Sequence, residues 1–259
     1  MFLKYINRIE LNTTELCNLK CSFCPRGHGY PNKNKHMTVE TASLIREQLN
    51  HMDYKKFVSI TGRGEPTLTR NFDKILDVML TDATYKTYMY TNGHSLDKYE
   101  QYIHMFWKVY IDVYDVHVDK YQHMVSKYKQ HENVTVMHKP DNGTTYQEFN
   151  KNTGNRFSNR GGYMQSDNPN FNKPCAFVFN KIFINWNGDY NLCCDDWEKQ
   201  LVLSNINKQT IAYYVEHNKI LQQYRQGHLN NARCSMDVCA TCTRDYYLPK
   251  KIHDKLTAT

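Results

Sequence analysis

Nine cysteines are divided between two stretches of the chain, and this grouping is the first sign of chemistry in the sequence. Three lie in residues 17–24 and six in residues 175–242, with none in residues 25–174. The start of the chain lacks the apolar core of a signal peptide, so we expect a cytoplasmic protein. Thiols in that compartment stay reduced, and grouped reduced thiols predict metal centres rather than disulfides.

The first group has the spacing C-x3-C-x2-C, formed by Cys17, Cys21 and Cys24. A [4Fe–4S] cluster normally takes four thiolates. Three thiolates would therefore leave one iron open to a ligand from outside the protein. On spacing alone, a tri-cysteine zinc site is the competing interpretation.

Alternating strand-like and helix-like segments must position these cysteines. The expected strands are Tyr5–Leu11, Lys56–Ile60, Tyr85–Tyr90, Val109–Val113 and Val134–Met137, and the expected helices are Thr38–Leu49, Phe72–Leu80, Leu96–Met105 and Lys120–Tyr128. This alternation predicts an α/β fold with parallel βαβ units, whose functional loops follow the carboxyl ends of the strands.

The pattern changes after Gly143, where polar residues dominate as far as Pro174. A hairpin over residues 177–193, with its turn at Asn187-Gly188, and a helix over Ile211–Arg225 are expected beyond it. We therefore predict two domains, comprising residues 1–165 and 166–259.

Two motifs resemble the signatures of the radical S-adenosylmethionine (SAM) enzymes. One is the segment from Cys17 to Pro25, and the other is Gly62-Arg63-Gly64-Glu65-Pro66. The resemblance implies a partial (β/α)6 TIM-type barrel, with SAM bound to the open iron of a [4Fe–4S] cluster.

Further cofactor contacts follow from the same resemblance. The family's equivalent of Phe23 lies near the adenine, although a packed core ring is an alternative role. Gly62, Gly64 and Glu65 would hold the amino group of SAM, with Arg63 standing where the family has a glycine. The same comparison assigns SAM contacts to Asn92 and Asp112, and also suggests His138 and Lys139, which an exposed loop pair would explain equally well.

The C-terminal cysteines resemble a SPASM/twitch module, which adds auxiliary iron–sulfur clusters to such barrels. Six cysteines are too few for the two clusters of a full SPASM module, so a twitch module with one [4Fe–4S] cluster is expected. Its implied ligands are Cys175, Cys193, Cys239 and Cys242. The G-x4-C spacing from Gly188 ends at Cys193 and favours it over Cys194. Neighbours on a strand face opposite ways, so both should not bind one cluster, although exchange of a ligand with Cys194 or Cys234 stays open. A structural zinc site remains the alternative, since C-x2-C is a standard zinc half-site.

Arg160 lies in an Asn-Arg-Gly-Gly turn that resembles related twitch enzymes at their sixth core strand. It would face the cavity between the clusters and hold substrate or SAM as a catalytic-site residue. A surface arginine on a turn is the equally weighted alternative.

The overall layout most resembles twitch-type aminocyclitol alcohol dehydrogenases. That resemblance implies a 5′-deoxyadenosyl radical that takes hydrogen from a small sugar- or cyclitol-like substrate, an auxiliary cluster that accepts an electron, and an external donor such as flavodoxin or ferredoxin. A maturase acting on a ribosomally made peptide is the alternative enzyme. The formal charge of +7 also admits a non-catalytic zinc or nucleic-acid-binding protein, but the basic residues are scattered, and no apolar run suits a membrane span.

Overall fold

One curved sheet of eight strands forms the centre of the computed structural model, which describes residues 2–166 and 172–258. The strand order is β5-β4-β3-β2-β1-β6-β7-β8. The strands are β1 (Arg8–Asn12), β2 (Phe57–Thr61), β3 (Lys86–Thr91), β4 (Lys108–Val113), β5 (Val134–His138), β6 (Lys181–Ile184), β7 (Asp189–Asn191) and β8 (Val202–Asn205). The strands β1 to β6 run parallel, whereas β7 and β8 continue the sheet in antiparallel fashion.

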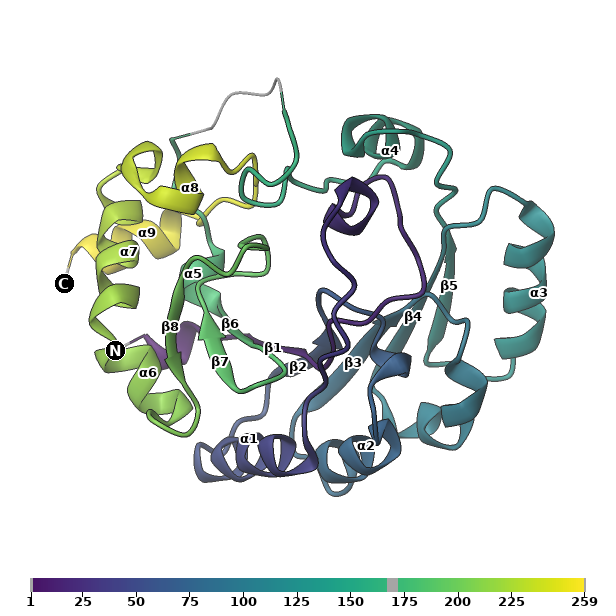
Figure 1. Cartoon of the computed structure of the whole chain (residues 1–259). Coiled ribbons are helices and arrows are strands. Elements are labelled where there is room, and N and C mark those ends of the chain that lie inside the picture. Colours follow the sequence, from purple (N-terminus) through teal and green to yellow (C-terminus); the bar gives the residue numbers. More distant parts are fainter. Residues whose placement is uncertain (1, 167–171, 259) are drawn as a thin grey trace.

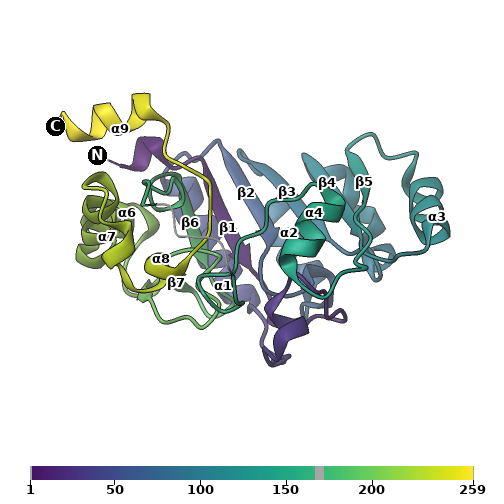
Figure 2. The ribbon, with the colours of Figure 1, turned by 90° about the horizontal axis from the view of Figure 1, so that it is seen from above.

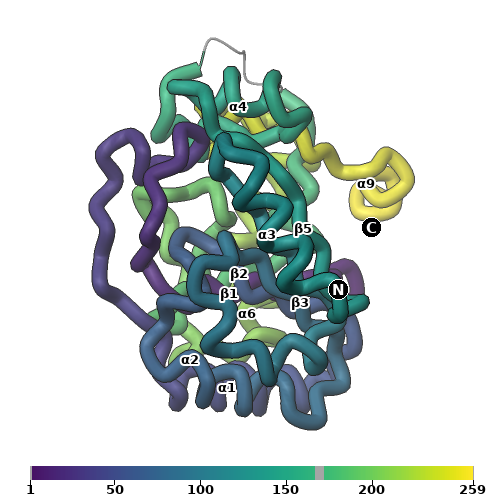
Figure 3. Tube along the Cα trace, turned by 90° about the vertical axis from the view of Figure 1, so that its right-hand side faces the viewer, coloured from purple at the N-terminus to yellow at the C-terminus, as the bar shows by residue number. Residues whose placement is uncertain are grey.

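The α-helices of the described residues are α1 (Val39–His51), α2 (Phe72–Leu80), α3 (Val118–Tyr128), α4 (Tyr146–Thr153), α5 (Phe177–Asn180), α6 (Ile211–His217), α7 (Lys219–Leu229), α8 (Asp237–Thr241) and α9 (Lys250–Thr257). Helices such as α1, α2 and α3 lie outside the curved sheet, whereas α4 and α8 lie at its open end (Figure 1). α1 and α2 lie side by side, and α4 lies at the opposite end of the molecule (Figure 3). Both chain ends lie near α6 and α7 (Figure 2).

Strand β1 shows how the sequence divides the two faces of the sheet. Its residues Ile9 and Leu11 are fully buried in the main apolar core, together with Val58 and Ile60 of β2. Burying each such side chain contributes about 1.5–3 kcal/mol relative to leaving it exposed. Because side chains alternate along a strand, the polar residues of β1 face the inner side of the curve.

The α/β class and six parallel strands are confirmed, but the sixth strand is not where the resemblance put it. Residues 155–159, before Arg160, have no regular structure. The sixth parallel strand is β6, which pairs with β1 at the other side of the sheet. Asn159 instead bonds to the C-terminal segment, with its Nδ2 donating to the Thr241 carbonyl at 2.9 Å. The division at residue 165 stays a prediction, although the sheet is continuous across it.

Local signals explain the remaining differences. The helix expected over Ile211–Arg225 breaks at Asn218, whose side chain caps α7 by accepting from the Leu221 N–H. Leu96–Met105 is 3-10 helical with a kink at Tyr99 rather than α-helical. The unexpected α4 begins with a capping box formed by Thr145 and Glu148. No helix in the described ranges is long and apolar enough to cross a membrane.

Candidate active site and auxiliary metal centre

The loop after β1 carries the first three cysteines, and Arg26 braces it. Arg26 is 5% exposed. Its Nε donates to the Arg63 carbonyl at 2.9 Å, and its Nη2 donates to the Glu15 carbonyl at 2.5 Å. Its Nη1 donates to Asn32 Oδ1, which also accepts from the Cys17 N–H. One buried side chain therefore joins the cysteine loop to the turn after β2.

A cavity of about 420 Å³ brings the predicted radical-site residues together. It is called the large cavity because it is the larger of two cavities that are each lined by four cysteines. The predicted site residues that line it are Cys17, Cys21, Phe23, Cys24, Gly62, Gly64, Glu65, Asn92, Asp112 and Arg160. Three soft thiols beside an open space suit a cluster that keeps one iron for an outside ligand. These side chains fit a [4Fe–4S] cluster with SAM, and their individual roles remain predictions.

The two glycines of the turn are needed for close approach to the cysteine loop. A Cβ on Gly64 would collide with the Thr14 carbonyl oxygen and lie 2.6 Å from that of Leu16. Gly62 has φ +127°, and a Cβ there would collide with the Asn12 side chain. The turn therefore packs on residues 12–16, which places its backbone beside the cysteines.

Both carboxylate oxygens of Glu65 accept hydrogen bonds from other residues of the protein. Its Oε1 accepts from the hydroxyls of Thr91 at 2.5 Å and Thr67 at 2.7 Å, and its Oε2 accepts from the Asn92 N–H at 2.8 Å. Burial raises the pKa of this carboxyl, although these hydrogen bonds oppose the shift. Glu65 therefore ties the end of β2 to the end of β3, and the backbone of the turn is left to contact a ligand.

Asp112 also binds a partner within the protein. That partner is Lys139, which the family resemblance suggested as a SAM contact. Lys139 Nζ lies 2.9 Å from Asp112 Oδ1, and the Tyr114 hydroxyl donates to Asp112 Oδ2 at 3.0 Å. Asn92 donates through Nδ2 to Asn18 Oδ1 at 2.8 Å, on the cysteine loop. His138 does not line this cavity.

Phe23 lies in an aromatic cluster and is 6% exposed. Its ring stacks on Phe157 with centroids 4.6 Å apart and approaches Phe149 to 4.1 Å. This packing supports the alternative role of a core ring, although Phe23 also reaches the cavity wall.

The four predicted auxiliary ligands line a second, smaller cavity. They are Cys175, Cys193, Cys239 and Cys242, of which all but Cys193 are buried. Burial raises the pKa of Cys175 to about 11. Loss of water around the half-buried Cys193, and then the charges of Asp195 and Cys194, raise the pKa of that thiol as well. Ionised thiols are therefore unfavourable here without a metal to compensate them.

Cys194 and Cys234 lie outside this set. Cys194 lines the large cavity and Cys193 lines the cavity of the other predicted auxiliary ligands, while a third, small cavity is lined by both. Cys234 is exposed. In residues 2–166 and 172–258, no three His, Cys, Asp or Glu side chains are arranged to bind a single metal ion. The four thiols line one cavity, and four cysteines are a ligand set that both a [4Fe–4S] cluster and a structural zinc ion use.

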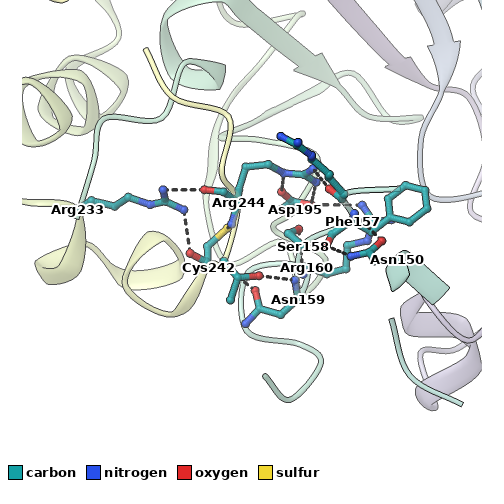
Figure 4. Close-up of polar contacts among 11 residues, drawn as sticks. Asn150, Phe157, Ser158, Asn159, Arg160, Asp195, Arg233, Cys242 and Arg244 are labelled. Atoms are coloured by element: carbon teal, nitrogen blue, oxygen red, sulfur yellow. Dashed lines mark hydrogen bonds and ion pairs between the residues drawn. The ribbon is translucent and has the colours of Figure 1, made fainter. Parts of the chain in front are cut away.

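An ion triad joins the two cavities (Figure 4). Arg244 binds Asp195 through two contacts of 2.7 and 2.8 Å, and Arg160 Nη1 lies 3.4 Å from the same carboxylate. Although burial opposes ionisation, Arg244 and then Arg160 hold the pKa of Asp195 well below its ordinary value. Arg160 lines the large cavity, and its guanidinium also lies 4.7 Å from the Phe157 ring.

Glu10 is the residue that the sequence reasoning missed. It lies in the middle of β1 and lines the large cavity. The signal was present, because a carboxylate between Ile9 and Leu11 must face away from the core. Among the described residues, its carboxylate has no hydrogen bond or ion pair.

Known proteins match this chain over both sites. The model of the radical SAM superfamily matches residues 11–146, and that of the SPASM iron–sulfur cluster-binding domain matches residues 175–243. The S-adenosyl-L-methionine-dependent 2-deoxy-scyllo-inosamine dehydrogenase of Niallia circulans is 24% identical over 243 residues, which are 92% of this chain and 93% of that protein. The crystal structure of BtrN in complex with AdoMet and 2-DOIA superposes with a TM-score of 0.78 at 21% identity, covering 95% of this chain and 96% of that one.

A second relative matches less than half of the chain. The GTP 3′,8-cyclase of Haemophilus ducreyi is 32% identical over 122 residues, which are 46% of this chain and 34% of that protein. The matches to both domain models confirm the expected cofactors, SAM with a [4Fe–4S] cluster and an auxiliary cluster. The superfamily model covers more than half of the sequence, so the chain belongs to the radical SAM superfamily and is an enzyme of that class.

Proposed function

We propose that this enzyme oxidises a secondary alcohol of a small sugar- or cyclitol-like substrate to a ketone. The observation that carries the proposal is one cavity lined by Cys17, Cys21 and Cys24, by Cys194 next to an auxiliary thiol, and by the uncommitted carboxylate of Glu10. The full-length similarity to a 2-deoxy-scyllo-inosamine dehydrogenase supports the reaction class.

Oxidising a secondary alcohol removes a hydrogen atom from carbon, a proton from the hydroxyl group and one further electron. When bound, the cluster with SAM supplies a carbon-centred radical for the hydrogen atom, and the auxiliary cluster supplies an acceptor for the electron. The proton must then go to a group of the protein or to water.

Glu10 is the carboxylate best placed to accept that proton. Glu65, Asp112 and Glu10 are the carboxylates that line the cavity. Glu65 is taken up by four hydrogen bonds and Asp112 by Lys139 and a tyrosine hydroxyl. Burial raises the pKa of Glu10, although Lys181 and Arg8 oppose the shift, and a raised pKa suits a general base.

The remaining cavity residues bind and orient rather than transfer protons. Arg160 is held by Asp195 at the wall facing the auxiliary thiols, where it would donate to an oxygen of the substrate or of SAM. An external one-electron donor such as flavodoxin or ferredoxin would reduce the radical cluster. If the enzyme modifies a peptide and not a small alcohol, its function is that of a maturase.

The test begins with anaerobic reconstitution and SAM plus a chemical reductant. We expect about eight iron per chain for two cubanes, release of 5′-deoxyadenosine, and ketone formation from 2-deoxy-scyllo-inosamine or a related cyclitol. Substrate oxidation should fall by about 10²–10⁴-fold in Glu10→Gln, whereas SAM cleavage without substrate should persist. Because the ionised base is active, the wild-type rate should fall as pH drops through the raised pKa of Glu10.

The matched control is Glu47→Gln on the outer surface, where the Glu47 side chain is 65% exposed, and it should retain the wild-type rate. Bound zinc without iron, or no 5′-deoxyadenosine from fully loaded protein, would refute the proposal. If Glu10→Gln oxidises the substrate at the wild-type rate, Glu10 is not the general base, but the proposed reaction still stands.

A further inference from the structure

Arg63 departs from the family's glycine and is not used by the mechanism above. It is 6% exposed, and its backbone N–H donates to Asn12 Oδ1 at 2.8 Å. The side chain leaves the turn after β2 and reaches the loop that follows β7. Its Nη2 makes a close hydrogen bond to the carbonyl of Asp196, and its guanidinium lies 6.0 Å from the Trp197 ring.

This side chain lies between the two cysteine groups. Arg63 lines the large cavity with Cys17 and Cys24, and it lines a smaller neighbouring cavity with Cys193 and Cys194. The carbonyl that it binds belongs to the residue three positions after Cys193 on one continuous loop. Arg63 therefore connects the SAM-side turn to the loop carrying a predicted auxiliary ligand.

The positive charge of Arg63 is not balanced by a close carboxylate. Within the described part of the chain, no acidic oxygen lies within 4 Å of its guanidinium, and its buried Nη1 has no hydrogen-bond partner. Glu10 lines both of these cavities with Arg63 but makes no ion pair with it, and the two aspartates that follow Cys194 are committed elsewhere. Asp195 binds Arg244 and Arg160, and Asp196 accepts from two backbone N–H groups of residues 200 and 201. Arginine remains protonated even when buried.

We propose that Arg63 raises the reduction potential of the auxiliary cluster and holds its Cys193 loop against the SAM-side turn. Reduction adds a negative charge to a cluster, and a fixed cation nearby stabilises that charge more strongly in a buried site than in water. The residue would thus make the auxiliary centre a better electron acceptor. This inference rests on the proposed function, in which that centre takes the substrate's electron.

The test measures the potential of the auxiliary cluster alone. A background variant with Cys17, Cys21 and Cys24 all changed to Ala keeps only the four-thiol site, and its cluster is titrated anaerobically with EPR detection. Adding Arg63→Gln should lower the equilibrium constant for reduction by about tenfold, which is about 59 mV for one electron. Arg63→Lys should retain most of the wild-type potential, and Lys250→Gln, which removes an 88% exposed charge, should leave it unchanged.

The outcomes separate this inference from the proposed function. If the background variant binds no iron, the four thiols hold no auxiliary cluster, and the electron acceptor of the proposed function is refuted. If it binds iron and the Gln and wild-type side chains give the same potential, only the role of Arg63 is refuted. If Arg63→Gln loses its iron, Arg63→Gly is titrated in its place, and loss of iron from both would make Arg63 a retention residue and overturn the tuning role.

Discussion

The two cysteine regions differ in how much of the chain is needed to build them. The first places three half-buried thiols on one short loop, beside a cavity of about 420 Å³. The second gathers four thiols from three separate segments around a small space, and three of them are buried. An open site with one missing ligand suits binding and chemistry, whereas a closed site with four ligands suits electron storage.

The means of support differ in the same way. Arg26 spans the first loop through hydrogen bonds to neighbouring carbonyls, and Asn18 and Ser22 of the loop bond to Asn92 and Asp141. The second site depends on contacts between distant segments, including the bridge from Cys175 to Tyr247 and the ion pair from Asp195 to Arg244. The first site should therefore tolerate changes elsewhere better than the second, and four experiments test this comparison.

The largest effect should come from Cys21→Ala, which removes one of only three predicted ligands of the open cluster. We expect 5′-deoxyadenosine formation to be abolished and iron to fall from about eight to about four per chain. Iron analysis and chromatography of the SAM products measure the two effects. Cys234→Ala, at an exposed cysteine, should change neither, and persistence of SAM cleavage in Cys21→Ala would contradict the assignment of the open site.

The next test compares two adjacent cysteines. Cys193→Ala should lose the auxiliary cluster, so that iron falls to about four per chain while SAM cleavage without substrate continues. Cys194→Ala should retain about eight iron, because its side chain lines the other cavity. The reverse result would show that Cys194, not Cys193, is the ligand.

A smaller, structural effect is expected for Asp195→Asn. Removing one charge from this buried triad should lower the free energy of unfolding by about 3–5 kcal/mol, because Arg244 stays buried without its partner. The lowered pKa of Asp195 means that its contribution is present above the unfolded-state pKa near 4 and is lost as pH falls through the folded value. Denaturant titrations at several pH values should show this acid-side loss in the wild type and not in Asp195→Asn.

The smallest effect should come from Gly64→Ala, which pushes a methyl group against the Thr14 and Leu16 carbonyls. We expect a loss of about 1–3 kcal/mol in unfolding free energy, together with weaker SAM binding. Gly154→Ala is the matched control, since its Cβ meets nothing within 4 Å and only the backbone at φ +69° is strained. Equal SAM affinities in the two variants would show that the turn after β2 does not contribute to SAM binding.

The sequence predicted local features well where one stretch carried the whole signal. The spacing of the first cysteines, the helix Phe72–Leu80 and the turn at Asn187-Gly188 depend on residues that are close together in the chain. Glu10 was missed because its alternation signal was short. α4 was missed although Thr145 and Glu148 form its capping box, because the surrounding segment is polar.

Tertiary structure decided what the spacing left open. The sequence alone determined the superfamily motifs, the alternating elements and the grouping of the thiols, since those depend on residue type and short-range order. Only the folded chain set β6 beside β1, committed Glu65 and Asp112 to internal partners, and placed Cys193, but not Cys194, in the cavity lined by the other three predicted auxiliary ligands. These outcomes depend on which distant groups meet, because a buried polar atom takes whichever partner the packing brings within reach.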